Sequence, residues 1–147
     1  MVVKKVLILI CCVAIMATVT LASQPARKLW ELRSCPECWE SDMGALDLLA
    51  KTIEDEPGAT GVIFVYGANS ERDDNIERRI RCFENYMTQR RGIPSKRIRV
   101  MIGGYREHAT IELWLVPSGA EEPTKTPTLG REDVKPARRG TKYRCDN

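Results

Sequence analysis

The stretch from residue 61 to 102 most constrains the fold, because it has the pattern of a strand, a helix and a second strand. Residues 61–66 are apolar on both faces, which is typical of a buried central strand. Residues 73–91 carry an apolar face at the helical period, made by Ile76, Ile80, Phe83 and Met87. Residues 97–102 alternate, which predicts a strand with Ile98, Val100 and Ile102 facing inward. Two strands joined by a crossover helix predict a parallel βαβ unit.

The flanking segments add further elements. Ser41 is a good cap for an amphipathic helix that runs to about Glu56 and stops before Pro57-Gly58. Residues 103–107 predict a turn, and 110–116 alternate as a third strand. Whether residues 29–32 form a fourth strand stays open. We therefore expect an α+β fold, a two-layer α/β sandwich with a βαβ core and a further C-terminal strand.

The chain of 147 residues divides by composition into four parts. Residues 1–22 predict a signal peptide, because two lysines precede an apolar run and a small-residue cleavage site ends at Ala22. If it stays uncleaved, this segment is the one contact with a membrane. Residues 23–40 form a lead that contains two cysteines, and 41–117 form the domain. Residues 118–147 are rich in proline and charge and poor in large apolar groups, which predicts a disordered tail.

Charge gives little indication of a polyanionic partner. Loss of the signal peptide removes two lysines and lowers the formal charge from +3 to +1. The arginines between residues 78 and 99 are balanced by nearby acids, so we interpret them as a solvated face. We expect no nucleic-acid partner for an exported protein of this charge.

Four cysteines remain after the signal: Cys35, Cys38, Cys82 and Cys145. An even number in an oxidising compartment predicts structural disulfides, and three pairings are open. A bridge from the lead to Cys82 would hold the lead on the domain, and Cys145 would tie back the tail. A Cys-x-x-Cys pair can also be a redox site when it opens a helix after a strand. Here the helix is expected to begin at Ser41, beyond both cysteines, which favours a structural role.

Signs of catalysis are absent from the sequence. One Cys-x-x-Cys pair supplies only two ligands, so we predict no metal site. His108 is the only histidine, and we interpret it as a solvent-exposed residue of a turn. The sequence has no signature of a nucleophile elbow, a phosphate loop or a catalytic carboxylate pair. We expect no enzyme activity and no cofactor.

The order of elements and several residues resemble the OmpA-like periplasmic domain family. The segments that carry the resemblance are 45–49, the strand 62–66, Arg78-Arg79 through Tyr86, Gly92-Ile93-Pro94, and Arg97-Ile98. The similarity covers about Ala45 to Val116. It implies an OmpA-like two-layer sandwich that binds peptidoglycan through the charged ends of its stem peptide.

In that family an arginine and an aspartate contact the charged ends of the ligand. Arg79 stands at the position of the family arginine. Asn69 stands where the aspartate is expected, and Asp73 follows as a substitute carboxylate. The resemblance thus implies Arg79, Asn69 and Asp73 as ligand-binding residues.

We therefore expect an exported, periplasmic or secreted protein with a non-catalytic role in the cell envelope. Its role would be binding or scaffolding, with peptidoglycan or another envelope component as partner. Two alternatives stay open: a secreted thiol–disulfide protein that uses Cys35 and Cys38, and a structural module with no small ligand.

Overall fold

The computed structural model describes residues 24–145, so the predicted signal peptide lies outside the described residues. The strands are β1 (Arg27–Arg33), β2 (Thr60–Ala68), β3 (Ile98–Arg106) and β4 (Thr110–Val116). The helices are α2 (Trp39–Asp55) and α3 (Asp73–Asn85), and a π-helical turn, η1 (Tyr86–Arg90), extends α3. Short 3-10 turns are η2 (Ser95–Arg97) and η3 (Arg131–Asp133). The fold class is α+β, as predicted.

The four strands form one mixed sheet in the order β1-β4-β2-β3. The predicted βαβ unit is confirmed, because β2 and β3 are parallel and α3 connects them. Strand β4 returns antiparallel between β1 and β2. The open question of a fourth strand is also settled: β1, from the lead, is an edge strand of the sheet. The lead is therefore part of the domain.

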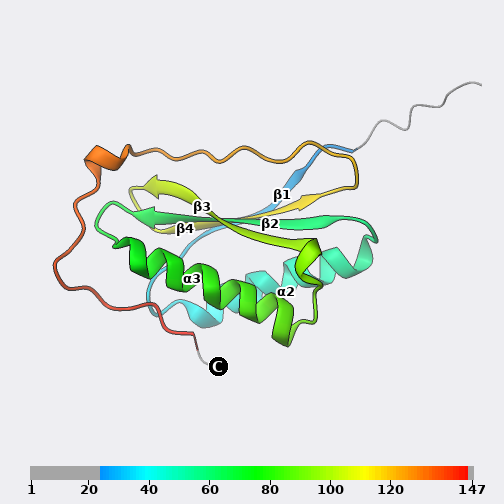
Figure 1. The fold of residues 1–147 in the computed structure, drawn as a ribbon, viewed down its shortest axis with the longest axis horizontal. Helices are drawn as coiled ribbons and strands as arrows, with labels where there is room; N and C mark the ends of the chain where they lie inside the picture. The colour runs from blue at the N-terminus through cyan, green and yellow to red at the C-terminus, as the bar shows by residue number, and fades with distance from the viewer. Residues whose placement is uncertain (1–23, 146–147) are drawn as a thin grey trace, which may run out of the picture.

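The sheet has a core on each face. Helices α2 and α3 cover one face (Figure 1), where Leu46, Ile53 and Phe83 pack against Ile63 and Val65 of β2. On the other face, a second cluster contains Val62, Phe64, Tyr66 and Val116. Because β2 has apolar side chains on both faces, it lies in the interior of the sheet, as its composition predicted.

Several predicted boundaries are wrong. Helix α2 begins at Trp39 rather than Ser41, with Cys38 as its N-cap residue. Residues 103–106 continue β3 instead of forming a turn, and a register shift against β2 follows Ile102. Ile102 itself is 47% exposed on this edge strand rather than buried. At the other end of α3, Gly92 has a φ of 68° and ends the helical segment, as predicted.

The segment after β4 is packed against the domain, which corrects the prediction of a disordered tail for the described residues 118–145. We call residues 117–145 the strap. It crosses the sheet face opposite the helices, then turns at one end of the molecule and reaches α3 (Figure 1). Backbone bonds hold it, for example Leu129 N–H to Tyr105 O (3.1 Å) and Lys135 N–H to Asn69 O (2.8 Å). Its low apolar content misled the prediction, since a few contacts anchor an otherwise irregular chain.

Two disulfides join the four cysteines: Cys35 with Cys38, and Cys82 with Cys145. The suggested bridge between the lead and Cys82 is therefore wrong. Instead Cys82, on α3, holds the end of the strap. Both bonds are compatible with an oxidising, exported environment.

Candidate functional site

A cleft of about 910 Å³ opens at the end of the sheet where β2 leads into α3. Its walls come from residues in four segments: 33–38, 68–78, 107–109 and 137–142. The first and third are connections that follow strands, the second is the loop after β2 with the first turns of α3, and the fourth is the strap. The rigid sheet and helices therefore present loop residues around a hollow, which is a common setting for a binding site.

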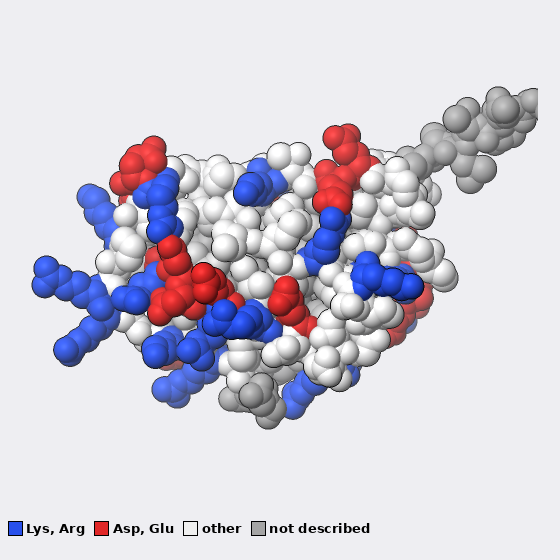
Figure 2. All heavy atoms as spheres, in the orientation of Figure 1, with Lys and Arg blue, Asp and Glu red and all other residues white. Residues whose placement is uncertain are grey.

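The cleft is strongly basic. Its lining contains six cationic side chains: Arg33, Arg72, Arg78, Arg138, Arg139 and Lys142. Figure 2 shows lysine and arginine side chains gathered at the end of the molecule where the strap turns. Of the three acids in the lining, Glu71 pairs with buried Arg79, and Asp74 pairs with Arg72. The cleft thus has an excess of positive charge suited to an anionic ligand.

Below the cleft, the strap inserts Tyr143 into a closed space between α2 and α3. Its ring makes edge contacts with Trp39 and Phe83, at centroid distances of 6.2 and 6.1 Å. Its hydroxyl donates to Asp42 Oδ2 (2.6 Å), and its backbone N–H donates to Asn75 Oδ1 (2.5 Å). We call this space, which Tyr143 fills, the tyrosine slot.

Arg79 forms one wall of the tyrosine slot and has no exposed surface. Its Nη2 donates to Glu71 Oε1 (2.6 Å), and its guanidinium lies 5.0 Å from the centroid of the Tyr143 ring. Within residues 24–145, Nε and Nη1 of Arg79 have no hydrogen-bond partner. Arg79 does not line the cleft, so the structure separates it from the surface where a ligand would arrive.

Asp42 is the second buried charged residue of the tyrosine slot. Burial raises the pKa of its carboxyl, while hydrogen bonds from Tyr143 and Ser34 and the charge of Arg79 act in the opposite direction. Oδ2 accepts both hydrogen bonds, and Oδ1 has no partner among the described residues. Sequence reasoning missed Asp42; its position on the buried face of α2, in register with Leu46 and Leu49, was the available signal.

The other two implied ligand residues lie apart from Arg79. Asn69 is exposed and lines the cleft, and its carbonyl accepts the N–H of Lys135 from the strap. Asp73 lies outside the lining and pairs with Arg131 and the Tyr105 hydroxyl. These partners lower the pKa of Asp73 to about 2. Of the three residues, only Asn69 faces the cleft.

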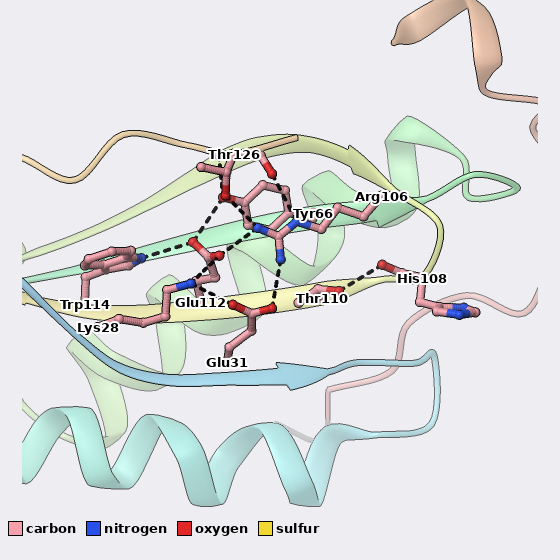
Figure 3. Close-up of polar contacts among 9 residues, drawn as sticks. All are labelled: Lys28, Glu31, Tyr66, Arg106, His108, Thr110, Glu112, Trp114 and Thr126. Carbon is pink, nitrogen blue, oxygen red and sulfur yellow. Dashed lines mark hydrogen bonds and ion pairs between the residues drawn. The ribbon is translucent and has the colours of Figure 1, made fainter. Parts of the chain in front are cut away.

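A separate polar cluster lies on the opposite face of the sheet, around Glu112 (Figure 3). Both oxygens of Glu112 are paired, with Lys28, Arg106, Tyr66 and Trp114. Burial opposes the charge, but the hydrogen bonds outweigh it and lower the pKa of Glu112 to about 2. His108, in the turn after β3, is exposed and points away from this cluster (Figure 3), as the sequence predicted for a turn histidine.

No group of three or more metal-ligating side chains occurs in the described residues. Between residues 24 and 145, none of the helices combines the length and apolar character that crossing a bilayer requires.

Comparison with known proteins leaves the chain without an assigned family. No protein-family model matches it, and no curated protein matches it either.

Proposed function

We propose that this chain is an exported binding protein of the cell envelope that holds an anionic ligand in the basic cleft. Peptidoglycan is the ligand class we propose, because its stem peptide carries carboxylates and the chain resembles the OmpA-like family. The mixed four-stranded sheet with two helices on one face is compatible with that family's two-layer fold. The two disulfides support export.

The observation that carries the proposal is the excess of cationic side chains around the cleft. Arg138 and Arg139 lie on the strap side, and Arg33 and Arg78 come from the domain. A guanidinium forms two parallel hydrogen bonds with a carboxylate, and such charge-assisted bonds are among the strongest in proteins. A ligand with several carboxylates would bridge the strap and the domain.

In this proposal Arg79 supports the site from below instead of contacting the ligand. Its partner Glu71 also accepts the N–H of Ala68 (3.2 Å) and the Asn75 amide (2.6 Å). These contacts hold the loop between β2 and α3, which carries Asn69 to the edge of the cleft. The role that the resemblance implied for Arg79 is thereby changed from contact to positioning.

The test is retention on purified peptidoglycan. The double variant Arg138→Glu/Arg139→Glu should be retained about tenfold less than wild type or weaker, because one lost charge-assisted hydrogen bond is worth about 1.5 kcal/mol. The matched control, Arg81→Glu/Lys96→Glu, changes charge equally at exposed residues outside the cleft and should bind like wild type. Arg79→Ala, where its melting curve shows it folded, should be retained less than wild type but more than the Arg138→Glu/Arg139→Glu variant, because it loosens the loop that carries Asn69 and removes no ligand contact.

Equal retention of wild type and both double variants would rule out the cleft as the binding surface. If no variant and no wild-type protein is retained, peptidoglycan is not the ligand, and the structural module without a small ligand becomes the better account.

A further inference from the structure

The Cys35–Cys38 disulfide lies in a short turn between a strand and a helix. Strand β1 ends at Arg33, and helix α2 begins at Trp39 with Cys38 as its N-cap residue. Both cysteines are half-buried, and both line the basic cleft. The bond is therefore accessible to a molecule that enters the cleft.

The surroundings of Cys38 favour a thiolate. Helix α2 has 17 residues, and its N-cap makes no side-chain hydrogen bond. Its first peptide N–H groups and the positive end of its dipole lie at Cys38, and this environment lowers the pKa of a cysteine. A helix that began at Ser41, as predicted, would disfavour redox chemistry, and the observed start at Trp39 removes that objection.

Asp42 provides an independent feature of the same turn. Its backbone N–H donates to the Cys38 carbonyl (2.9 Å), so it lies one helical turn beyond the cysteine. The side chain is fully buried, and Oδ1 has no partner in the described part of the chain. Ser34, directly before Cys35, donates to Oδ2 (2.7 Å). A buried carboxyl with one oxygen that lacks a hydrogen-bond partner can hold a proton during thiol–disulfide exchange.

The second disulfide differs in the position of Cys82 and in the length of chain that it spans, although Cys145 is half-buried like the first pair. Cys82 is buried in the helix-side core and bonds to Cys145, 63 residues along the chain. It lies within a helix rather than at its start. Its position fits a structural bond that holds the strap, and it provides an internal reference for the first pair.

We propose that Cys35–Cys38 is a redox-active disulfide that oxidises dithiols of acidic peptides bound in the cleft. A substrate thiolate attacks Cys35 Sγ, forms a mixed disulfide and breaks the Cys35–Cys38 bond, and Cys38 leaves as a thiolate at the helix N-terminus. The second substrate thiolate then attacks the mixed-disulfide sulfur of the substrate, which releases Cys35. The substrate loses two electrons and the pair gains them, and both cysteines end as thiols after taking up the two substrate protons.

Turnover requires a second disulfide, of oxidised glutathione or of another protein, to accept the two electrons. This activity goes beyond ligand retention and does not depend on peptidoglycan. The Cys35→Ser/Cys38→Ser variant should still bind whatever ligand the cleft holds.

The first test compares the two disulfides within one molecule. The protein is equilibrated in glutathione buffers of increasing reduced fraction, alkylated and digested with trypsin. Cys35 and Cys38 share the tryptic peptide 34–51, so their reduction is counted separately from that of Cys82 and Cys145. We expect the first pair to be reduced where the second stays oxidised. Reduction of both pairs together would overturn the proposal.

The second test follows oxidation of a dithiol peptide flanked by Asp and Glu, with a Lys-flanked peptide as its charge-reversed match. The acidic peptide should be oxidised at least about tenfold faster at low salt, and Arg138→Glu/Arg139→Glu should abolish that preference. Asp42→Asn should slow the exchange by about tenfold or more at neutral pH.

The cysteine variants complete the test. Cys35→Ser/Cys38→Ser should be inactive, whereas Cys82→Ser/Cys145→Ser should remain active if circular dichroism shows it folded. In Cys38→Ser, Cys35 should accumulate a mixed disulfide with an oxidised substrate peptide, because the second cysteine is missing. If Cys35→Ser/Cys38→Ser oxidises the peptide as fast as wild type, the proposal is wrong.

Discussion

Two buried charged clusters lie on opposite faces of the sheet, and the strap covers both. Around Glu112, four donors reach the two carboxylate oxygens at 2.7 to 3.1 Å. In the tyrosine slot, by contrast, Arg79 makes one ion pair and leaves Nε and Nη1 without partners among residues 24–145. Asp42 likewise uses only one of its oxygens.

This difference fits a structural role for the Glu112 cluster and the positioning role that we propose for Arg79 in the tyrosine slot. A buried charge whose hydrogen bonds are all made stabilises one arrangement of the chain, whereas unpaired buried donors cost free energy. The Glu112 cluster holds the strap on the sheet, because its members Arg106 and Tyr66 are hydrogen-bonded to Thr126 of the strap. The tyrosine slot keeps its unpaired atoms directly beneath the cleft and beside the Cys35–Cys38 turn.

The largest effect is expected from Glu112→Ala. It removes the shared partner of Lys28 and Arg106 inside the protein, and breaking a buried pair costs about 3–5 kcal/mol of unfolding free energy. Urea unfolding measures the loss. Glu31→Ala is the matched control, because exposed Glu31 contacts the same two cations and should cost about 1 kcal/mol or less. Equal costs for the two variants would contradict the structural role of Glu112.

The next effect concerns the end of the strap. Cys82→Ser/Cys145→Ser should lower the unfolding free energy by about 2–4 kcal/mol, since the bond closes a long loop. Hydrogen exchange should then show loss of protection at Tyr143 while residues near Glu112 stay protected. If residues along the whole strap lose protection together, the Cys82–Cys145 disulfide and the Glu112 cluster do not hold the strap independently.

A smaller change is expected for Tyr143→Phe. Loss of the hydroxyl leaves Asp42 Oδ2 with one donor, which should cost about 1.5–3 kcal/mol, the range for hydrogen bonds to charged groups. Thermal or urea unfolding checks this value. Tyr105→Phe removes a hydroxyl that contacts partly exposed Asp73, and should cost less. If Tyr105→Phe cost more unfolding free energy than Tyr143→Phe, the hydrogen bond in the tyrosine slot would be the weaker of the two.

The smallest effect is the pH dependence of stability, because the carboxyls of Glu112 and Asp42 change the unfolding free energy in opposite directions as the pH falls. Glu112 has its pKa lowered from 4.5 to about 2, so its stabilisation is present above pH 4.5 and is lost as pH falls toward 2. Asp42 has a raised pKa, so its contribution is present below 3.8 and is lost as pH rises through the folded value.

Melting temperatures between pH 2.5 and 7 separate the two contributions. Glu112→Gln should lose less stability than wild type on acidification, and Asp42→Asn should lose more. If melting temperature depended on pH in the same way for Asp42→Asn and wild type, the pKa of Asp42 would not change on folding.

Local patterns were enough for the interior of the fold. The apolar composition of β2, the helical period of α3 and the glycine at residue 92 each act through near neighbours, and the structure agrees with them. The first residue of α2 was predicted two positions late, because Ser41 is a better cap by composition than Cys38. That shift of two residues reversed the expectation for the Cys-x-x-Cys pair.

The candidate site was harder to predict, because its parts come from distant segments. Asn69 lines the cleft, but Arg138 and Arg139 lie in a segment that we expected to be disordered. Arg79 was expected to face a ligand, and it is instead covered by Tyr143, 64 positions later in the chain. No local pattern relates these two residues.

The sequence by itself determined the α+β class and the parallel βαβ unit, because hydrophobic periodicity reports which side of each element is buried. Only the tertiary structure decided the pairing of the cysteines, the path of the strap and the burial of Arg79. These features depend on single long-range contacts, such as Tyr143 with Asp42 and Cys82 with Cys145. Such contacts leave no periodic signal, since one anchored side chain can hold a segment whose composition alone would not predict order.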